Sequence, residues 1–320
     1  MTGKMEARPK YRIYPSQLDK FQELLDYEKV AEEDWNKIDD TGDYRLTPDE
    51  MYVKIESELI DSINRCPHSP SEAADKGTVF NEIVDCLVEH RKPSEKFSFE
   101  KLYSPQQMWV PERMGIGDNM DVTPGHYEPR NVLVGIRASY NGWVFDFDYT
   151  LCKEAAEFFA GSLTQFFAQS VMNTAYGDVE IYGYIDEWPD NKMYDIKTTG
   201  RYTFGKFERK WQRHAYPWCV VNSGMATEIE SFTYWVVEWA YQRKGDLLMA
   251  KSVTQETYTY DHQDSGIKLR YHIEAFIEWL ESRREFIQDK KIFGGENPEG
   301  WRGTPVDIEK LKKVIFKETA

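Results

Sequence analysis

Apolar residues recur at helical spacing in several stretches of the chain and cluster as in strands elsewhere. Thr47-Pro48-Asp49-Glu50 has the composition of a helix start, with a capping hydroxyl, a first-turn proline and a glutamate three residues after the cap. A mostly helical apolar stripe follows it, from Met51 to Ile63. A second helix is predicted from Lys76 to His90, where apolar positions again repeat with the helical period. These positions are Val79, Phe80, Ile83, Val84, Leu87 and Val88.

The middle of the chain has a different pattern. Residues 91–150 contain many glycines and prolines, which predict an insertion or irregular β region with short strands at 131–138 and 143–149. A helix is predicted from Lys153 to Met172, because its alanines and phenylalanines form a wide apolar face. Further along, the pattern predicts strands at 229–238 and 254–261 and a helix from Ile273 to Ile287.

Two β-rich segments, Val179 to Asp186 and Lys192 to Thr198, are separated by a short polar turn. Strands joined in this way form a hairpin. A helix is predicted next, from Gly205 to Val221. Together these elements predict an α/β (α+β) fold in which helices flank a central mixed β-sheet.

The hairpin places three reactive side chains together. Asp195 and Lys197 are two apart on one strand and therefore project to the same face, while Ile196 turns into the core. Asp186 ends the preceding strand, so strand pairing brings its carboxylate beside Asp195. Adjacent carboxylates repel unless a cation lies between them, and Mg²⁺ prefers oxygen ligands. We therefore expect Asp186, Asp195 and the Ile196 carbonyl to bind Mg²⁺, for which Mn²⁺ can substitute.

These groups suit the hydrolysis of a phosphodiester bond. A bound divalent cation polarises the phosphate and lowers the pKa of a water molecule. Lys197 would orient or deprotonate that water, or neutralise charge in the transition state. Gln212 and Tyr216 are four residues apart on the next helix, so they share one of its faces and complete the predicted catalytic set.

The charge distribution is uneven. The formal net charge of the 320 residues is −15, which by itself disfavours a nucleic-acid partner. From Lys197 to Arg213, however, six basic residues and one acidic residue give a local net charge of +5. The field at the site matters more than the total charge. The predicted DNA-binding residues are Arg201, Lys206, Arg209, Lys210 and Arg213. Trp188 and Trp211 also lie beside this site, with core packing as their expected role and base stacking as the alternative.

The cysteines and the apolar runs limit which cofactors the protein can bind and where in the cell it is expected. Cys66, Cys86, Cys152 and Cys219 are scattered, so we expect reduced, mostly buried thiols, no zinc site and no iron–sulfur cluster. No apolar run approaches the roughly 20 residues that cross a membrane. The N-terminal segment also lacks the apolar stretch of a signal peptide. A soluble cytoplasmic protein without a membrane partner is expected.

The order of these residues resembles the RecB-like branch of the PD-(D/E)XK nuclease superfamily, which includes lambda-type exonucleases. Gly183-Tyr184-Ile185-Asp186 is similar to the first metal aspartate of the family, and Tyr194 to Thr199 is similar to its D-x-K strand. Gln212 to Tyr216 matches the QxxxY element of this branch. The resemblance covers about residues 76–221. It implies a restriction-endonuclease-like core and metal-dependent DNA cleavage, most simply by an exonuclease in phage or bacterial recombination and repair.

The upstream helix departs from the family pattern. Gly77 to Asp85 is similar to the family's G-T-x-x-H-x-x-x-E helix, but Asn81 stands where the histidine is expected. The resemblance implies that Glu82 supplies the acid ligand instead, as in lambda-type members, with Asp85 as the next candidate. The alternative is that both are exposed charges on an amphipathic helix.

We expect a helical N-terminal extension at 1–75, the nuclease core at 76–290 with its insertion around 91–150, and a C-terminal tail at 291–320. The first functional hypothesis is an active DNA nuclease. The second is a DNA-binding or assembly module that kept the fold and lost its full chemistry, and the third is a hydrolase of another phosphodiester such as RNA. The sequence leaves open the strand preference, endo- or exonuclease action, and whether a second copy or a recombination or replication protein binds to it.

Overall fold

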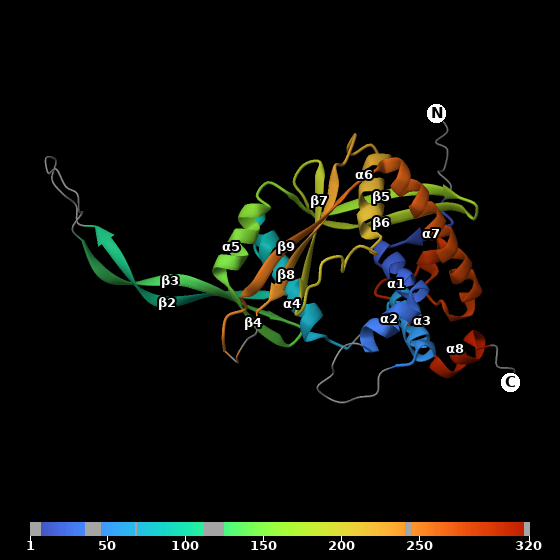
Figure 1. The fold of residues 1–320 in the computed structure, drawn as a ribbon, viewed down its shortest axis with the longest axis horizontal. Coiled ribbons are helices and arrows are strands. Elements are labelled where there is room, and N and C mark those ends of the chain that lie inside the picture. The colour runs from blue at the N-terminus through green and yellow to red at the C-terminus, as the bar shows by residue number, and fades with distance from the viewer. Residues whose placement is uncertain are drawn as a thin grey trace.

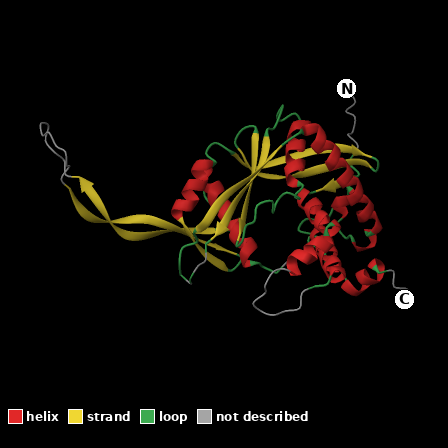
Figure 2. Cartoon of the chain, in the orientation of Figure 1, coloured by secondary structure: helices red, strands yellow, loops and turns green. Residues whose placement is uncertain are grey.

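The computed structural model describes residues 8–35, 46–67, 69–111, 125–240, 243 and 245–316. In these ranges helices flank a central mixed sheet, which confirms the predicted fold class (Figures 1 and 2). The elements are β1 (Tyr11–Ile13), α1 (Pro15–Leu25), α2 (Tyr27–Trp35), α3 (Pro48–Ile63), α4 (Glu72–Val88), β2 (Ser98–Pro111), β3 (Gly125–Tyr140), β4 (Trp143–Asp148), α5 (Tyr149–Phe158), β5 (Leu163–Thr174), β6 (Gly177–Trp188), β7 (Lys192–Thr199), α6 (Gln212–Asn222), β8 (Ser231–Trp239), β9 (Ala250–Thr259), α7 (His262–Ser282), the 3₁₀ turns η1 (Arg284–Phe286) and η2 (Lys290–Phe293), and α8 (Ile308–Ile315).

In the central sheet, one edge of strand β6 pairs with two different strands. The described strands of this sheet run in the order β1-β6-β7-β8-β9, and β5 pairs antiparallel with β6 from end to end. The other edge of β6 is shared: β1 pairs in parallel with Val179–Ile181, whereas β7 pairs with it at Glu187 and Tyr194. The part of β6 that contains Asp186 therefore faces the point where β1 and β7 separate.

Two apolar cores cover the two faces of the sheet. All nine residues of the central strand β8 are buried, as expected for a strand covered on both sides. Phe232, Tyr234 and Val236 face one core, which contains residues of α1, α3, α6, α7 and α8. Trp235 and Val237 face the other, built with α4, α5 and the second sheet. Because successive side chains of β8 point to opposite faces, this one strand contributes to both apolar cores.

The N-terminal and C-terminal segments belong to the first core. The predicted helical extension at 1–75 contributes β1 to the central sheet, and α1 packs against α3, α6 and α7. The C-terminal helix α8 packs against α3. Asn64, directly after α3, accepts a 2.7 Å hydrogen bond from the Gln288 N–H, and its carbonyl accepts one of 2.8 Å from the Gly303 N–H. The chain ends are therefore tied together around the sheet.

The predicted insertion forms a second, antiparallel sheet in the order β2-β3-β4. The long β2–β3 hairpin projects away from the body of the molecule (Figure 1). Several of its large side chains are exposed, among them Tyr103, Trp109 and Tyr127. Trp109 packs edge-on against Tyr127 with ring centroids 5.3 Å apart. The strands predicted at 131–138 and 143–149 are confirmed within β3 and β4.

The predicted helix from Lys153 to Met172 is confirmed as far as Phe158 and is wrong beyond it. Helix α5 ends at Phe158, and Gly161 then adopts a left-handed φ of +86°. The chain returns as β5, which pairs with β6. The spacing of alanines and phenylalanines in this segment is compatible with both a helix and a strand. Residues 163–174 form a strand because they pair with β6.

Other predicted boundaries hold to different degrees. The capping box at Thr47 is confirmed, since Thr47 Oγ1 accepts from the Glu50 N–H and the Glu50 carboxylate returns a 2.8 Å bond to the Thr47 N–H. Helix α6 begins at Gln212 instead of Gly205, and α7 begins at His262, well before the predicted Ile273. The strands predicted near 229–238 and 254–261 are confirmed as β8 and β9. The four cysteines are free and buried, as expected. Among the described helices, none combines the length and apolar character needed to span a bilayer.

Candidate active site

The hairpin brings Asp186, Asp195 and Lys197 together. Lys197 Nζ lies 2.6 Å from Asp195 Oδ2. Asp186 Oδ2 accepts a 2.9 Å hydrogen bond from the backbone N–H of Ile196, the residue between the other two. This bond spans the gap that opens where β6 and β7 separate. The three side chains therefore meet at one point of the sheet.

The backbone carbonyl of Ile196 turns toward the same gap. The N–H and C=O of one strand residue point to the same side of the strand. Since the Ile196 N–H points to Asp186, the carbonyl oxygen also faces β6. The sequence-derived ligand set of Asp186, Asp195 and the Ile196 carbonyl is thus gathered around this gap.

The strand next to Asp186 is locally irregular. Gln165 of β5 has a left-handed φ of +45°, and the β5–β6 register passes from Thr164–Glu187 to Phe166–Ile185 around it. Gln165 Nε2 donates a 3.3 Å hydrogen bond to Asp186 Oδ1. A left-handed residue other than glycine costs on the order of 1–3 kcal/mol, and such strain concentrates at functional sites. Here it orients an amide toward the candidate metal ligand.

Helix α4 presents Asn81 to the site. The Asn81 Nδ2 group lies 3.5 Å from Asp186 Oδ2, and its Oδ1 is buried without a hydrogen-bond partner among the described residues. Glu82, the ligand implied by the resemblance, lies elsewhere. Its carboxylate forms a 2.8 Å ion pair with Arg91 and accepts a 2.7 Å bond from the Ser94 N–H. The structure therefore does not bring Glu82 to the aspartates, because the arginine that follows the helix binds it.

The site concentrates negative charge. Burial and then the charge of Asp195 raise the pKa of Asp186 to about 7, although Lys197 and the Ile196 N–H oppose this rise. Burial and then Asp186 raise the pKa of Asp85 to about 7. Glu187 is completely buried, and burial together with Asp85 raises its pKa to about 9. A divalent cation would relieve this mutual repulsion.

Lys197 is held in its charged form. Burial lowers the pKa of this lysine, but the negative charges of Asp195 and Asp186 outweigh burial, and the net shift is upward. An ammonium group donates hydrogen bonds and neutralises phosphate charge, but it cannot accept a proton. The 2.6 Å ion pair with Asp195 positions this ammonium for charge neutralisation and orientation, two of the roles expected for Lys197.

Two glycines allow neighbouring helices to approach the hairpin. A Cβ atom at Gly183 would lie 2.7 Å from Cε1 of Tyr216, and one at Gly77 would lie 2.7 Å from Oγ1 of Thr198. Gln212 and Tyr216 are both buried on α6, so the QxxxY pair packs directly over β6. Burial raises the pKa of Tyr216 well above its ordinary value, and nearby Tyr14, Asp195 and Asp186 add to this.

Asp19 of α1 is a site residue that the sequence did not reveal. Its Oδ1 accepts a hydrogen bond from the Trp211 N–H at the start of α6. Burial raises its pKa to about 6, against the opposing effects of Lys210, the Trp211 N–H and Lys197. It lies far from the hairpin in sequence, and no local motif surrounds it. Only the packing of α1 against α6 places it near Lys197.

The predicted DNA-binding residues divide into two groups. Arg209 pairs with Asp26 at 3.2 Å, and Lys210 pairs with Glu23 at 3.0 Å. Arg213 lies over the ring of Tyr258, 4.2 Å from its centroid. These three basic side chains are thus occupied by neighbouring elements. Arg201 and Lys206 are exposed on the loop that follows β7. Trp211 stacks on His272 at 3.9 Å and Trp188 packs edge-on against Phe166, so both tryptophans pack within the protein.

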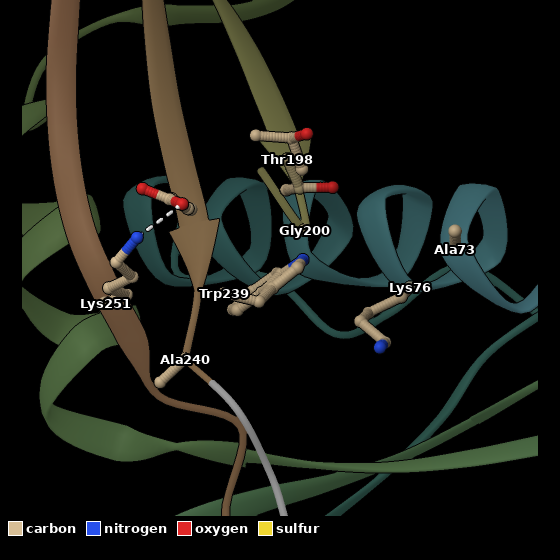
Figure 3. A pocket seen from close by; sticks show the side chains of 9 residues that line it. Ala73, Lys76, Thr198, Gly200, Trp239, Ala240 and Lys251 are labelled. Carbon is tan, nitrogen blue, oxygen red and sulfur yellow. Dashed lines mark hydrogen bonds and ion pairs between the residues drawn. The ribbon is translucent and has the colours of Figure 1, made fainter. Parts of the chain in front are cut away.

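A pocket of about 540 Å³ opens at the carboxyl ends of the parallel strands β7 and β8 (Figure 3). Lys76 and Lys251 lie on either side of Trp239, and Thr198 and Gly200 form part of the wall. Lys251 pairs with Glu238 at 2.8 Å. Thr198 follows Lys197 in β7, but successive side chains of a strand point to opposite faces, and the pocket lining contains none of the three reactive side chains.

The residues fit a divalent cation with few protein ligands. The described residues contain no group of three or more histidine, cysteine, aspartate or glutamate side chains arranged to bind a metal. The oxygen atoms around the gap come from two carboxylates, the Ile196 carbonyl and the unpartnered Asn81 Oδ1. Mg²⁺ is commonly bound through one or two carboxylates, with water and substrate phosphate completing its shell. This donor set matches that pattern.

Comparisons with known proteins add little to this geometry. No protein-family model matches the chain, and no curated protein matches its sequence. A solved structure titled "Crystal structure of SSO0001" is similar with a TM-score of 0.35 and 10% identity, over 84% of this chain and 79% of that one. A TM-score this low does not establish a common fold.

Proposed function

We propose that this protein is a Mg²⁺-dependent deoxyribonuclease that hydrolyses phosphodiester bonds. The observation that carries the proposal is the meeting of Asp186, Asp195 and Lys197 where β6 and β7 separate. Two neighbouring carboxylates that repel each other beside a lysine have no evident structural purpose, whereas phosphodiester hydrolysis uses all three groups. The sequence resemblance supports an exonuclease of phage or bacterial recombination and repair, acting in the cytoplasm.

Each residue has a defined part in this reaction. Asp186, Asp195 and the Ile196 carbonyl would hold the cation, with Asn81 beside them. The cation supplies phosphate polarisation and a water of lowered pKa. The Lys197 ammonium, fixed by Asp195 at 2.6 Å, neutralises charge on the phosphate oxygens. Gln212 and Tyr216 hold α6 against β6, and Asp19 holds the start of α6.

Two observations favour a second candidate, a DNA-binding or assembly module with weakened chemistry. Glu82 is paired with Arg91, and Asn81 replaces a stronger ligand. Such a protein would bind DNA and leave it intact.

A cleavage assay separates the two candidates. Linear and circular DNA, single- and double-stranded, and single-stranded RNA are each incubated with the protein in Mg²⁺, Mn²⁺ or EDTA. We expect cleavage that EDTA abolishes and that Lys197→Ala reduces by about 10²–10³-fold, the range typical for loss of one group that stabilises transition-state charge. Lys192→Ala is the matched control, because Lys192 lies on the same strand and pairs only loosely with Glu230, at 3.7 Å. Binding without cleavage in every condition would support the second candidate, and cleavage of RNA alone would redirect the substrate assignment.

A further inference from the structure

The loop between β7 and α6 carries an unusually exposed aromatic side chain. Phe204 is 80% exposed, more than any other large apolar side chain that the structure describes. The loop begins immediately after β7, the strand that bears Asp195 and Lys197. A single exposed apolar side chain is common on protein surfaces, so exposure alone assigns no role to Phe204 and the surrounding contacts must decide.

A buried carboxylate fixes the shape of this loop. Glu256 of β9 is 1% exposed and accepts hydrogen bonds from the Tyr202 hydroxyl at 2.6 Å, the Gly205 N–H at 3.2 Å and the Phe207 N–H at 3.1 Å. The Tyr258 hydroxyl donates a further bond. Gly205 has a left-handed φ of +84°, which glycine adopts without strain. The backbone on both sides of Phe204 is therefore held, and the phenyl ring is presented outward.

Basic residues precede and follow Phe204 in the same loop. The Lys206 Nζ group donates to Thr199 Oγ1 at 2.8 Å and to the Arg201 carbonyl at 3.3 Å, which places this ammonium across the base of the loop. Arg201 is exposed and makes no ion pair within the described ranges, in contrast to Arg209 and Lys210. Glu208 is the acidic residue of this loop. An exposed aromatic ring and basic side chains on one loop are the combination that binds single-stranded nucleic acid, with bases stacked and phosphates neutralised.

We propose that Phe204 stacks on an unpaired base of the polynucleotide, while Arg201 and Lys206 bind the phosphates beside it. The base would belong to the strand whose phosphate lies at Lys197, so the site would select single strands or frayed ends over intact duplex. Glu256 is the positioning residue that keeps the loop in the stacking conformation. This inference rests on the proposed function for its substrate and adds the strand preference.

Binding is measured in the Lys197→Ala background, so that cleavage does not interfere. Fluorescence anisotropy follows a labelled single-stranded oligonucleotide and a blunt duplex of the same sequence. Phe204→Ala is expected to weaken single-strand binding about 5- to 100-fold, the range for loss of one base-stacking aromatic residue, and to leave duplex binding nearly unchanged. Phe204→Trp, which keeps an aromatic ring at this position, is expected to bind the single strand about as well as the wild type does. Ile267→Ala is the control, since Ile267 is an exposed apolar residue on α7.

Glu256→Gln provides an independent variant. It keeps the size of the side chain and weakens its hold on the loop, so we expect the same selective loss, with Tyr202→Phe giving a smaller one. Quenching of a 2-aminopurine base in the single strand reports stacking directly and should disappear in Phe204→Ala. If Phe204 does not contact the base, the 2-aminopurine signal will be the same in Phe204→Ala and in the wild type.

The outcomes distinguish this inference from the proposed function. If the wild-type chain cleaves DNA and Phe204→Ala behaves like wild type, only the stacking role is lost. If the chain does not cleave but Phe204 still governs single-strand binding, the stacking role stands and the nuclease proposal fails. Equal losses on single strand and duplex, failure of Phe204→Trp to restore binding, or no binding of either oligonucleotide would overturn the inference.

Discussion

At the scale of single residues, the chemistry of this protein depends on two carboxylates that the fold holds close to each other. Asp186 is half-buried and keeps an elevated pKa of about 7, first through burial and then through the charge of Asp195. A group whose pKa is raised on folding binds its proton more tightly in the folded protein than in the unfolded chain. Its protonated form therefore contributes stability at low pH, and that contribution is lost as the pH rises from about 4 to about 7.

Cation binding should show the opposite dependence on pH. Because Asp186 must lose its proton to bind a metal, affinity for Mn²⁺ should rise about tenfold per pH unit below 7 and level off above it. Titration calorimetry from pH 5.5 to 8.5, in two buffers of different ionisation enthalpy, measures both the affinity and the proton released. The Asp186→Asn variant should bind weakly at every pH. An affinity that stays flat across this range would contradict the assignment of Asp186.

The same residue predicts a stability effect. Without divalent cations at pH 8, Asp186→Asn removes a charge that repels Asp195 and should raise the melting temperature by a few degrees. Adding Mn²⁺ should reverse the order, since only the wild type gains stability from binding the ion. Thermal unfolding followed by circular dichroism checks both. A variant that is less stable than wild type without metal would show that Asp186 has a structural role instead.

At the scale of elements, the hairpin and its supporting helices are placed by close contacts at glycine. A methyl group at Gly183 would meet the Tyr216 ring at 2.7 Å, between β6 and α6. Gly183→Ala should therefore destabilise the protein by about 1–3 kcal/mol, as overpacking in a core usually does. Cleavage should fall as well, because α6 must shift from the catalytic strand. Gly200→Ala, where nothing lies within 4 Å, is the control for urea unfolding. Equal stability of the two variants would show that Tyr216 moves freely.

The elements that the sequence predicted correctly are those defined by neighbours in the chain. The capping box at Thr47 and the alternation in β6 and β7 are local patterns, and the pairing of Asp195 with Lys197 follows from strand geometry alone. What failed depended on partners outside the segment itself. Leu163–Thr174 is a strand because β6 lies beside it, and Glu82 is unavailable because Arg91 binds it. The basic segment is half neutralised because α1 and α2 fold onto it.

At the scale of the whole molecule, the N-terminal elements that the structure describes pack into the rest of the fold. β1 completes one edge of β6, α1 supplies Asp19 to the start of α6, and α3 is joined to the segments before α8. The residues outside the region that resembles a nuclease family therefore hold the candidate site in place. They also account for much of the negative charge around the basic segment.

Truncation tests this integration. A chain beginning at Lys76 loses β1 and helices α1 to α3, which belong to the larger core, and should lose cooperative unfolding. Urea denaturation followed by tryptophan fluorescence should show a broad, non-cooperative change. A chain beginning at Arg8 retains these elements and should unfold in one sharp transition. A stable, active fragment from Lys76 onward would contradict this view and would establish residues 76–320 as an independent unit.

The central claim is that a divalent cation binds between Asp186 and Asp195, beside Lys197. The most direct measurement is anomalous X-ray scattering from a crystal of the protein soaked in Mn²⁺. The account predicts a peak within coordination distance of both carboxylates and of the Ile196 carbonyl oxygen, and no peak there in an Asp195→Asn crystal. A fully occupied Mn²⁺ elsewhere, with Asp186 and Asp195 left without one, would contradict it.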